Sequence, residues 1–263
     1  MSVLLIDTPN FVKGLVYGKN DVESLCHLLD KKIRIFMWKF DIIETNIVFC
    51  YDCFKKDSWR RDFYSEYKNK VRSESNNKCS NNDIMNMVIG AYEYLIEKYS
   101  NASHMRYNTL EADDIIAIAV KTINPRRKCY ILSNDNDMGQ CLHLNPNCEW
   151  YKITEMEKMQ PRVYNNQYEW VCAKVLMGDN ADNLMPSILG KSGKGLKVAV
   201  DEMHNIICNL LLPRGILPEA DTLPYNIDYL TWSTNWTLID MENIPEMLTL
   251  RATNYFNWWN QDV

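Results

Sequence analysis

Alternating stretches of apolar and polar positions predict a chain in which strands and helices alternate. Four short apolar runs are rich in β-branched and aromatic residues, which is typical of buried strands. Between them lie longer segments whose apolar residues recur every three to four positions, as on the buried face of a helix. The predicted strands are Val3–Ile6, Asn46–Tyr51, Cys129–Leu132 and Cys148–Ile153, and the predicted helices are Asp21–Phe40, Asp83–Tyr99, the segment that follows Asp114, and Gln167–Met177.

The order strand, helix, strand predicts a mostly parallel sheet, because parallel neighbours need a crossover that a helix usually makes. The first strand would end in Asp7 and then turn at Thr8-Pro9-Asn10, since proline cannot continue a ladder. The second would deliver Asp52 to the same edge. Ligands of open α/β sheets bind beyond the carboxyl ends of the strands, so we expect both aspartates to face one crevice.

Two acidic clusters lie in the middle of the chain. Glu111–Asp114 precedes an apolar helix, whose first turn suits carboxylates, and Ser133–Asp137 follows a predicted strand. Carboxylates that converge on one crevice repel each other unless cations are present. Oxygen ligands favour Mg²⁺ or Mn²⁺ over zinc. The sequence therefore predicts a divalent metal site that includes Glu111, Asp113, Asp114, Asp135 and Asp137.

The net charge of −5 is concentrated in the acidic motifs. Without nine motif acids the remaining chain carries +4, so the negative total does not exclude a nucleic-acid partner. Lys55–Lys78 holds eight basic against four acidic residues with aromatics between them, a mixture suited to single-stranded nucleic acid. Composition leaves open the alternative of a solvated amphipathic segment. Ser73–Asn82, rich in Ser and Asn, is expected to be a mobile loop.

Two further motifs follow the helix Gln167–Met177. Gly178–Asn183 holds two aspartates three positions apart, which can share one face and one metal or its water shell. Gly190–Ala199 places a glycine-rich turn with three lysines before an apolar helix, where backbone amides can approach a phosphate. The Walker A pattern is absent from this turn, which argues against a nucleotide triphosphatase.

The remaining features indicate a reduced, intracellular protein. Nine cysteines at irregular spacing are typical of free thiols, no apolar run is long enough for a membrane span, and the chain begins directly with a strand. We therefore expect no membrane association and a cytoplasmic location. Leu238–Met241 is expected to be a last strand or an extended packing segment. Four tryptophans are expected to fill core or interdomain gaps: Trp232, Trp236, Trp258 and Trp259.

The motifs together resemble those of one family, the flap endonuclease / 5′–3′ exonuclease family, in particular its compact bacteriophage members. They occur in that family's order over roughly residues 3–200. The matching motifs are Leu5–Asp7, Phe49–Asp52, Trp59-Arg60 with Tyr67-Lys68, Leu110–Asp114, Ser133–Asp137 and Gly178–Asn183.

The resemblance implies a PIN-like α/β nuclease domain over residues 1–165, with an arch segment at about 55–100. It also implies a helix–three-turn–helix DNA-binding region and a C-terminal packing segment over residues 166–263. By similarity a first Mg²⁺ or Mn²⁺ ion would be surrounded by Asp7, Asp52, Glu111 and Asp113, and a second site would be built by Asp114, Asp135, Asp137, Asp179 and Asp182.

The resemblance also assigns roles in catalysis and DNA binding. Catalysis would rest on Lys68, Asp7, Asp113 and Asp135, with Lys68 facing the scissile phosphate at the base of the arch. The family's arginine after the Tyr-Lys pair would be replaced by Arg72 or Lys70. A monovalent cation at the glycine turn is left open. The DNA contacts would be Arg60, Tyr67, Lys68, Lys70, Arg72, Gly193, Lys194, Gly195 and Lys197.

These features predict a structure-specific 5′ nuclease of replication or repair that hydrolyses DNA by a two-metal mechanism. Its substrate would be DNA with a 5′ single-stranded end, flap or nick, and the protein would be a monomer in a bacterial host if a phage encodes it. The sequence leaves open whether exonuclease or flap endonuclease activity is preferred. It also leaves open whether RNA–DNA hybrids are cleaved and whether replication proteins are partners. The alternatives are a PIN-type ribonuclease and a non-catalytic DNA-binding scaffold.

Overall fold

A computed structural model describes residues 2–16, 19, 21–69, 81–160, 167–209 and 224–259. The chain forms two compact units. The sheet unit comprises Met1–Ser58, Arg72–Gln160 and Glu246–Val263, and the helical unit comprises Trp59–Val71 and Pro161–Pro245. Compared with the predicted domains, residues 59–71 are grouped with the helical unit and residues 246–263 with the sheet unit. The functional assignment of these domains stays a prediction.

The sheet unit is built on five parallel strands in the order β3-β2-β1-β4-β5. In the central pair Asp7 lies beside Cys50, so the carboxyl ends of all strands meet at one edge. The predicted mostly parallel sheet is therefore confirmed. The strands are β1 (Val3–Asp7), β2 (Ile47–Cys50), β3 (Ser103–Met105), β4 (Cys129–Leu132) and β5 (Cys148–Tyr151).

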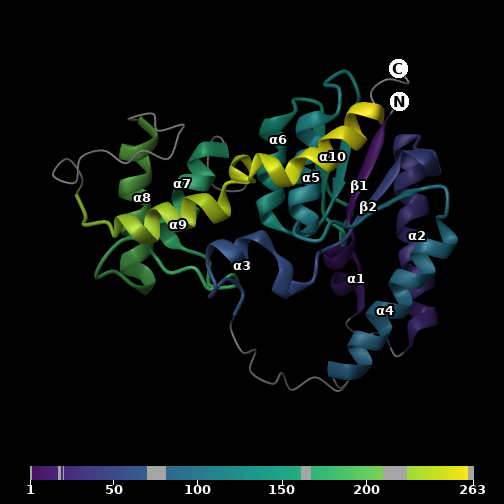
Figure 1. Ribbon diagram of the computed structural model, residues 1–263, viewed down its shortest axis with the longest axis horizontal. Coiled ribbons are helices and arrows are strands. Elements are labelled where there is room, and N and C mark those ends of the chain that lie inside the picture. The colour runs from purple at the N-terminus through teal and green to yellow at the C-terminus, as the bar shows by residue number, and fades with distance from the viewer. Residues whose placement is uncertain are drawn as a thin grey trace. The chain divides into compact units, whose positions relative to one another are not determined.

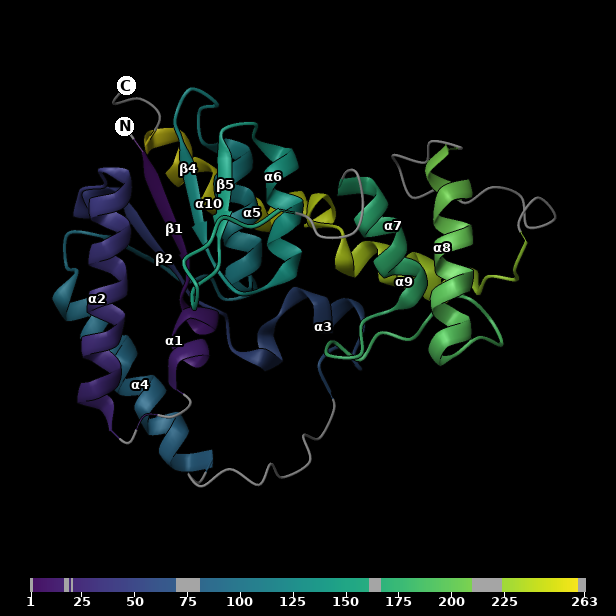
Figure 2. The ribbon, with the colours of Figure 1, turned by 180° about the vertical axis from the view of Figure 1, so that it is seen from behind.

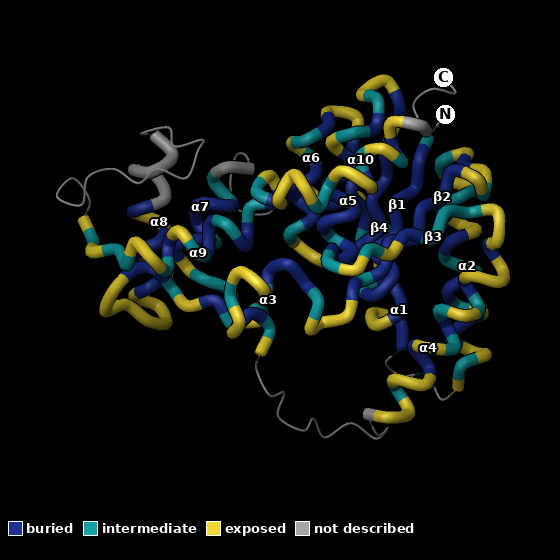
Figure 3. The backbone as a smooth tube through the Cα atoms, viewed as in Figure 1, coloured by how far each residue is buried: buried dark blue, intermediate teal, exposed yellow. Residues whose placement is uncertain are grey.

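Helices cover both faces of this sheet (Figures 1 and 2). Leu4 and Ile6 of β1 point to one face and join a core that includes Phe11, Leu29 and Leu95. Figure 3 shows the buried strands between helices whose outer sides are exposed. One face carries α1 (Thr8–Val16), α2 (Val22–Phe40) and α4 (Asn81–Lys98), and the other carries α5 (Ala112–Thr122), α6 (Cys141–Leu144) and α10 (Glu246–Trp259).

Local sequence explains where α2 begins and ends. The side chain of Asp21 accepts a hydrogen bond of 2.7 Å from the Ser24 amide, and Asp41 closes the helix in the left-handed conformation at φ 51°. Three 3₁₀ turns flank the strands of this unit: η1 (Glu44–Asn46), η2 (Lys55–Asp57) and η3 (Asn136–Gln140).

Three sequence expectations were wrong or incomplete in this region. Thr8–Asn10 is not a turn but the start of α1, because proline fits the first helical turn, where its missing amide is not needed. The edge strand β3 was missed, since its polar Ser103 and His104 show no strand pattern. Of the expected loop at 73–82, residues 73–80 lie outside the described part of the structure, and Asn81 and Asn82 belong to α4.

The helical unit contains α3 (Trp59–Phe63), α7 (Gln167–Met177), α8 (Gly193–Asn209) and α9 (Tyr229–Ile239). Helix α7 packs against both α8 and α9. The buried amide of Asn235 donates hydrogen bonds to the carbonyls of Val175 at 2.9 Å and Met185 at 2.8 Å, which ties α9 to the end of α7.

Leu238–Met241 is neither the last strand nor the extended packing segment that was expected. Leu238 is helical in α9, and Met241 begins the 3₁₀ turn η5 (Met241–Asn243), because side chains of Asp228 and Asp240 accept the first amides of these two elements. Trp232 and Trp236 are buried and stack with ring centroids 5.3 Å apart, as the core-packing prediction requires. The side chains of Trp258 and Trp259 lie outside the described part of the structure. In the described residues no helix combines the length and apolarity of a membrane span.

Gly178→Ala is expected to destabilise the helical unit. Gly178 has φ +72°, and a Cβ there would lie 2.5 Å from the Leu184 carbonyl oxygen. The left-handed backbone alone should cost about 1–3 kcal/mol in the free energy of unfolding. Urea denaturation measures this, with Gly195→Ala as the control, since a Cβ at Gly195 meets nothing within 4 Å. Equal stability of the two variants would contradict the structural role of Gly178.

Candidate active site

The buried carboxylate of Asp7 lies at the end of β1 and links two strands. Its Oδ2 accepts a hydrogen bond from the Ser133 hydroxyl at 2.7 Å, and its Oδ1 accepts one from the Asn10 amide at 3.2 Å. The same Ser133 oxygen accepts the amide of Asp135 at 3.0 Å. Ser133 thus holds the carboxyl ends of β1 and β4 together and positions both aspartates.

Burial raises the pKa of Asp7 to about 7. The Ser133 and Asn10 hydrogen bonds oppose this shift, while the nearby carboxylates of Asp52 and Asp135 add to it. The ionised form of Asp7 is therefore disfavoured by its own surroundings. A cation at this position would relieve both the desolvation and the repulsion.

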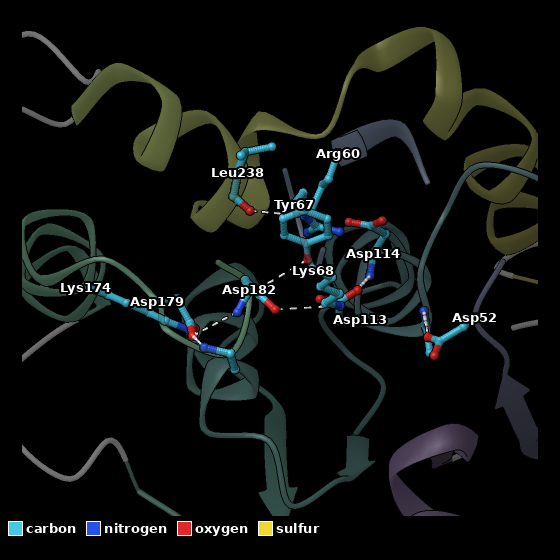
Figure 4. Close-up of polar contacts among 12 residues, drawn as sticks. Asp52, Arg60, Tyr67, Lys68, Asp113, Asp114, Lys174, Asp179, Asp182 and Leu238 are labelled. Atoms are coloured by element: carbon cyan, nitrogen blue, oxygen red, sulfur yellow. Dashed lines mark hydrogen bonds and ion pairs between the residues drawn. The ribbon is translucent and has the colours of Figure 1, made fainter. Parts of the chain in front are cut away.

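The amino terminus of α5 holds a second group of carboxylates. Asp52 accepts the Ala112 amide at 3.1 Å, Asp114 accepts the Glu111 amide at 2.9 Å, and Asp113 accepts the Asp114 amide at 2.8 Å. Figure 4 shows Asp52, Asp113 and Asp114 gathered around this helix end. The positive end of the helix dipole offsets part of their repulsion. The predicted placement of Glu111 to Asp114 at a helix start is confirmed.

The pKa values of two buried thiols are raised in part by the carboxylates of this edge. The pKa of Cys53 is raised to about 12, first by burial and then by the carboxylates of Glu111, Asp52 and Asp114. Burial also raises the pKa of Cys141, and Cys148, Asp113 and Asp137 raise it further. Both thiols therefore stay protonated at neutral pH in the metal-free protein.

The donor chemistry of this edge fits a hard divalent cation. Among the residues the structure describes, no three His, Cys, Asp or Glu side chains converge closely enough to form a ready metal cage. The carboxylates instead hold backbone amides, as Asp135 holds the Asp137 amide at 2.9 Å. Their oxygens are nevertheless the ligands that Mg²⁺ and Mn²⁺ prefer. Seven predicted ligands belong to this unit: Asp7, Asp52, Glu111, Asp113, Asp114, Asp135 and Asp137.

The other two predicted metal ligands lie in the helical unit, in the loop after α7. Asp179 accepts the Ala181 amide at 2.7 Å and pairs with the Lys174 ammonium at 2.7 Å. Burial works to raise the pKa of Asp179, but Lys174 and the amides of Ala181 and Asp182 outweigh it and hold that pKa below its usual range. Asp179 is therefore ionised and fixed in orientation.

Asp182 is a direct neighbour of the predicted catalytic lysine (Figure 4). Its side chain accepts the Tyr67 hydroxyl at 3.4 Å and lies 3.9 Å from the Lys68 ammonium. Its carbonyl accepts the Lys68 amide at 2.9 Å, and Lys68 has a left-handed φ of 53°. The Asn183 side chain donates to the Glu66 carbonyl at 2.9 Å. The Tyr67-Lys68 pair and the Asp179–Asp182 loop therefore form one local structure.

Arg60, a predicted DNA contact, is buried within the helical unit. Its guanidinium donates to the Leu238 carbonyl at 3.0 Å and lies 4.9 Å from the Trp59 ring centroid. The structure thus gives Arg60 a role in joining α3 to α9, and its DNA contact stays a prediction. Lys70 and Arg72 lie outside the described residues.

The glycine turn begins α8 directly. Gly190 and Gly193 have left-handed φ values of 70° and 51°, and nothing lies within 4 Å of the Cβ position at either. Lys194 and Lys197 are exposed in the first turns of the helix, and Gly195 also has open space around it. This helix start leaves room for a phosphate to approach the backbone. The predicted phosphate contact stays a prediction.

Sequence reasoning missed several residues that hold the site. Ser133 lies inside a recognised motif, but no role was assigned to it. Asn10 and Lys174 were also missed. Their only signal is position: Asn10 stands three residues after Asp7, and Lys174 stands five before Asp179. Such contacts across a fold become visible only in three dimensions.

Known nucleases are similar to this chain in sequence. A family model described as the N-terminal, resolvase-like domain of 5′-3′ exonuclease matches residues 21–169. The chain is 26% identical over 260 residues to the protein of Enterobacteria phage T4 named Ribonuclease H, covering 91% of this chain and 79% of that relative.

The fold is shared with two solved structures of bacteriophage T5 proteins. One is a variant of the D15 flap endonuclease in a pseudo-enzyme-product complex with DNA and metal ions, with TM-score 0.68 and 15% identity, covering 99% of this chain and 100% of that chain. The other is the T5 5′-exonuclease with bound zinc ions, with TM-score 0.68 and 16% identity, covering 97% and 98%. Because the family model spans more than half of the sequence, and the matched residues include every carboxylate of the edge described above except Asp7, this chain belongs to the 5′-3′ exonuclease family of nucleases.

Proposed function

We propose that this nuclease hydrolyses DNA phosphodiesters beside a 5′ single-stranded end, flap or nick, and that it depends on divalent metal ions. The observation that carries the proposal is the buried Asp7, whose pKa is raised by burial and by Asp52 and Asp135. An arrangement of this kind is costly for folding alone and is suited to cation binding. The T4 and T5 relatives carry names of 5′ nucleases and of ribonuclease H, which fits the same reaction class.

The proposal assigns two ions of Mg²⁺ or Mn²⁺ to the carboxylates. Bound divalent cations lower the pKa of an attacking water and neutralise charge on the leaving oxygen. The first group of ligands is Asp7, Asp52, Glu111 and Asp113, and the second is Asp114, Asp135, Asp137, Asp179 and Asp182.

The chain's own residues would orient the substrate. The Lys68 ammonium, which lies 5.0 Å from the centroid of the Tyr67 ring, would stabilise charge on the scissile phosphate. The ammonium lies 3.9 Å from the Asp182 carboxylate, which it would exchange for a phosphate oxygen of the substrate. Ser133 would keep Asp7 and Asp135 in register, because it bonds to both.

Duplex DNA would be held by the start of α8. Lys194 and Lys197 would neutralise phosphates, and the open backbone at Gly193 and Gly195 would let one strand approach the helix amides. Contacts to phosphates carry no sequence information, so we expect selectivity for structure rather than for sequence.

A second candidate substrate is the RNA strand of an RNA–DNA hybrid. The observation that favours it is the name of the T4 relative, Ribonuclease H. The same carboxylates would serve both substrates, because the reacting group is a phosphodiester in each.

Asp135→Asn is expected to lower cleavage of a 5′-labelled flap duplex in Mg²⁺ by at least about 100-fold, because it removes a charged ligand. Lys68→Ala should lower kcat by about 10- to 1,000-fold with smaller change in KM. The matched control is Asp41→Asn, since Asp41 is exposed at the end of α2 in a left-handed conformation that asparagine adopts readily.

The same assay separates the alternatives when a single-stranded RNA and an RNA–DNA hybrid are included. Cutting of the flap and not of single-stranded RNA supports the proposal, and additional cutting of the hybrid adds the second substrate. If only single-stranded RNA is cut, the chain is a ribonuclease. If nothing is cut although duplex is bound, it is a scaffold.

Asp7 is expected to make the stability of the metal-free protein depend on pH. Its pKa is about 7 in the folded protein against an ordinary 3.8, so the folded state takes up a proton that the unfolded state has lost. The contribution of Asp7 to the free energy of unfolding is therefore greatest below pH 3.8. It falls as the pH rises from 3.8 to about 7, by up to about 4 kcal/mol in total.

Thermal melts in EDTA from pH 4 to 8 measure this dependence. Asp7→Asn should flatten the profile, and Mg²⁺ at pH 8 should raise the Tm of the wild type more than that of the variant. Matching profiles for both proteins would show that Asp7 is not the titrating group.

A further inference from the structure

Arg106 continues the row of charged groups at the carboxyl edge of the sheet. It directly follows Met105, the last residue of β3, and its side chain is exposed. Because the strands are parallel and ordered β3-β2-β1-β4, the edge presents in turn Arg106, Asp52, Asp7 and Asp135. A cation therefore stands at one end of a row of carboxylates.

The guanidinium of Arg106 lies over a rigid aromatic platform. Its Cζ is 5.3 Å from the ring centroid of Tyr51, which is only 3% exposed. The Tyr51 hydroxyl is hydrogen-bonded to Nδ1 of His104 at 3.0 Å, and that imidazole stacks on Phe49 at 4.8 Å. The ring beneath the guanidinium is thus fixed by the sheet itself, and the cation–π contact favours one position of Arg106.

Tyr92 of α4 completes the group. Its ring meets Tyr51 edge to face with centroids 5.3 Å apart. Burial raises the pKa of Tyr92, Asp52 and Asp7 raise it further, and Arg106 works in the opposite direction. The phenol therefore stays neutral at physiological pH and can donate a hydrogen bond.

The Arg106 guanidinium and the Tyr92 hydroxyl can both donate hydrogen bonds to an anion. In the described part of the chain Arg106 forms no ion pair, so its fork of N–H groups faces solvent. A guanidinium beside a neutral phenol matches the two unesterified oxygens of a phosphodiester. Because β2 lies between β3 and β1, which are about 10 Å apart, Arg106 is placed to one side of Asp7, where a neighbouring phosphate of the same strand would lie.

We propose that Arg106 and Tyr92 form a subsite for the backbone phosphate next to the scissile one. The inference rests on the proposed function, since it presupposes that a phosphodiester is bound at the carboxylate edge. The subsite fixes the register of the strand, so that one chosen linkage reaches the carboxylates. Arg106 and Tyr92 are binding residues, and their loss weakens substrate binding more than the chemical step.

Steady-state cleavage of flap duplexes tests the subsite. Arg106→Ala should raise KM by about 10- to 100-fold with kcat changed by less than about threefold, the loss expected for a charge-assisted hydrogen bond. Arg106→Lys should restore part of the loss, because it keeps the charge without the fork. Tyr92→Phe keeps the ring and removes the hydroxyl, so a smaller rise in KM is expected.

The matched control is Arg126→Ala. Arg126 is also an exposed arginine, but it precedes β4 and so lies at the opposite edge of the sheet. Its replacement should leave KM and kcat unchanged. Equal effects of the two alanine variants would overturn the subsite and indicate general charge attraction.

Substrates with one neutral methylphosphonate linkage locate the contact. In the wild type, a methylphosphonate at one linkage that neighbours the cut should raise KM. In Arg106→Ala, the same modified substrate should give no further rise in KM. Additive effects at every linkage would overturn the subsite while the nuclease function stands. A wild type that cleaves none of the unmodified flap duplexes would overturn the proposed function itself.

Discussion

Repulsion among carboxylates at one edge of a parallel sheet is the constraint on which the rest of the sheet unit depends. The parallel register brings the ends of β1, β2 and β4 together, so Asp7, Asp52 and Asp135 influence one another. The protein offsets part of the repulsion with the amides at the start of α5 and with the Ser133 hydroxyl. The pKa of Asp7 stays raised despite these hydrogen bonds, first because of burial and then because of the carboxylates of Asp52 and Asp135.

In the helical unit, local contacts fix the position of a positive charge, the Lys68 ammonium. Lys68 is held by its own backbone, which bonds to the Asp182 carbonyl, and by the Asp182 carboxylate near its ammonium. Asp179 is in turn fixed by Lys174. Such alternation of acids and bases holds these side chains in fixed orientations, although the whole loop is only partly buried.

Much of the fold could be predicted from the sequence because its signals are strong and local. The strand Cys129–Leu132 and the helix Gln167–Met177 have the predicted bounds, and the start of α5 follows from the acidic residues at its first turn. The failures have physical causes. β3 is too short and polar to show a period, Pro9 is equally compatible with a turn and a helix start, and Leu238–Met241 is too short to separate strand from helix.

The sequence predicted the type of site, a carboxylate edge, but not the contacts that hold its residues in place. Acidic residues after strands mark the carboxyl edge, but the roles of Ser133 and Arg106 depend on contacts with residues far away in the sequence. The buried position of Arg60 has the same origin, because its partner Leu238 lies 178 residues away. Composition could not show that this arginine is buried and bonded to α9.

Anomalous diffraction from crystals grown with Mn²⁺ above pH 7 tests whether the carboxylate edge binds metal, since it locates the ions without reference to activity. Two anomalous peaks are expected at the carboxyl edge of the sheet, with the peak beside Asp7 lost in Asp7→Asn. An edge without peaks in crystals of protein that still cleaves DNA in Mn²⁺ would contradict metal binding at this edge.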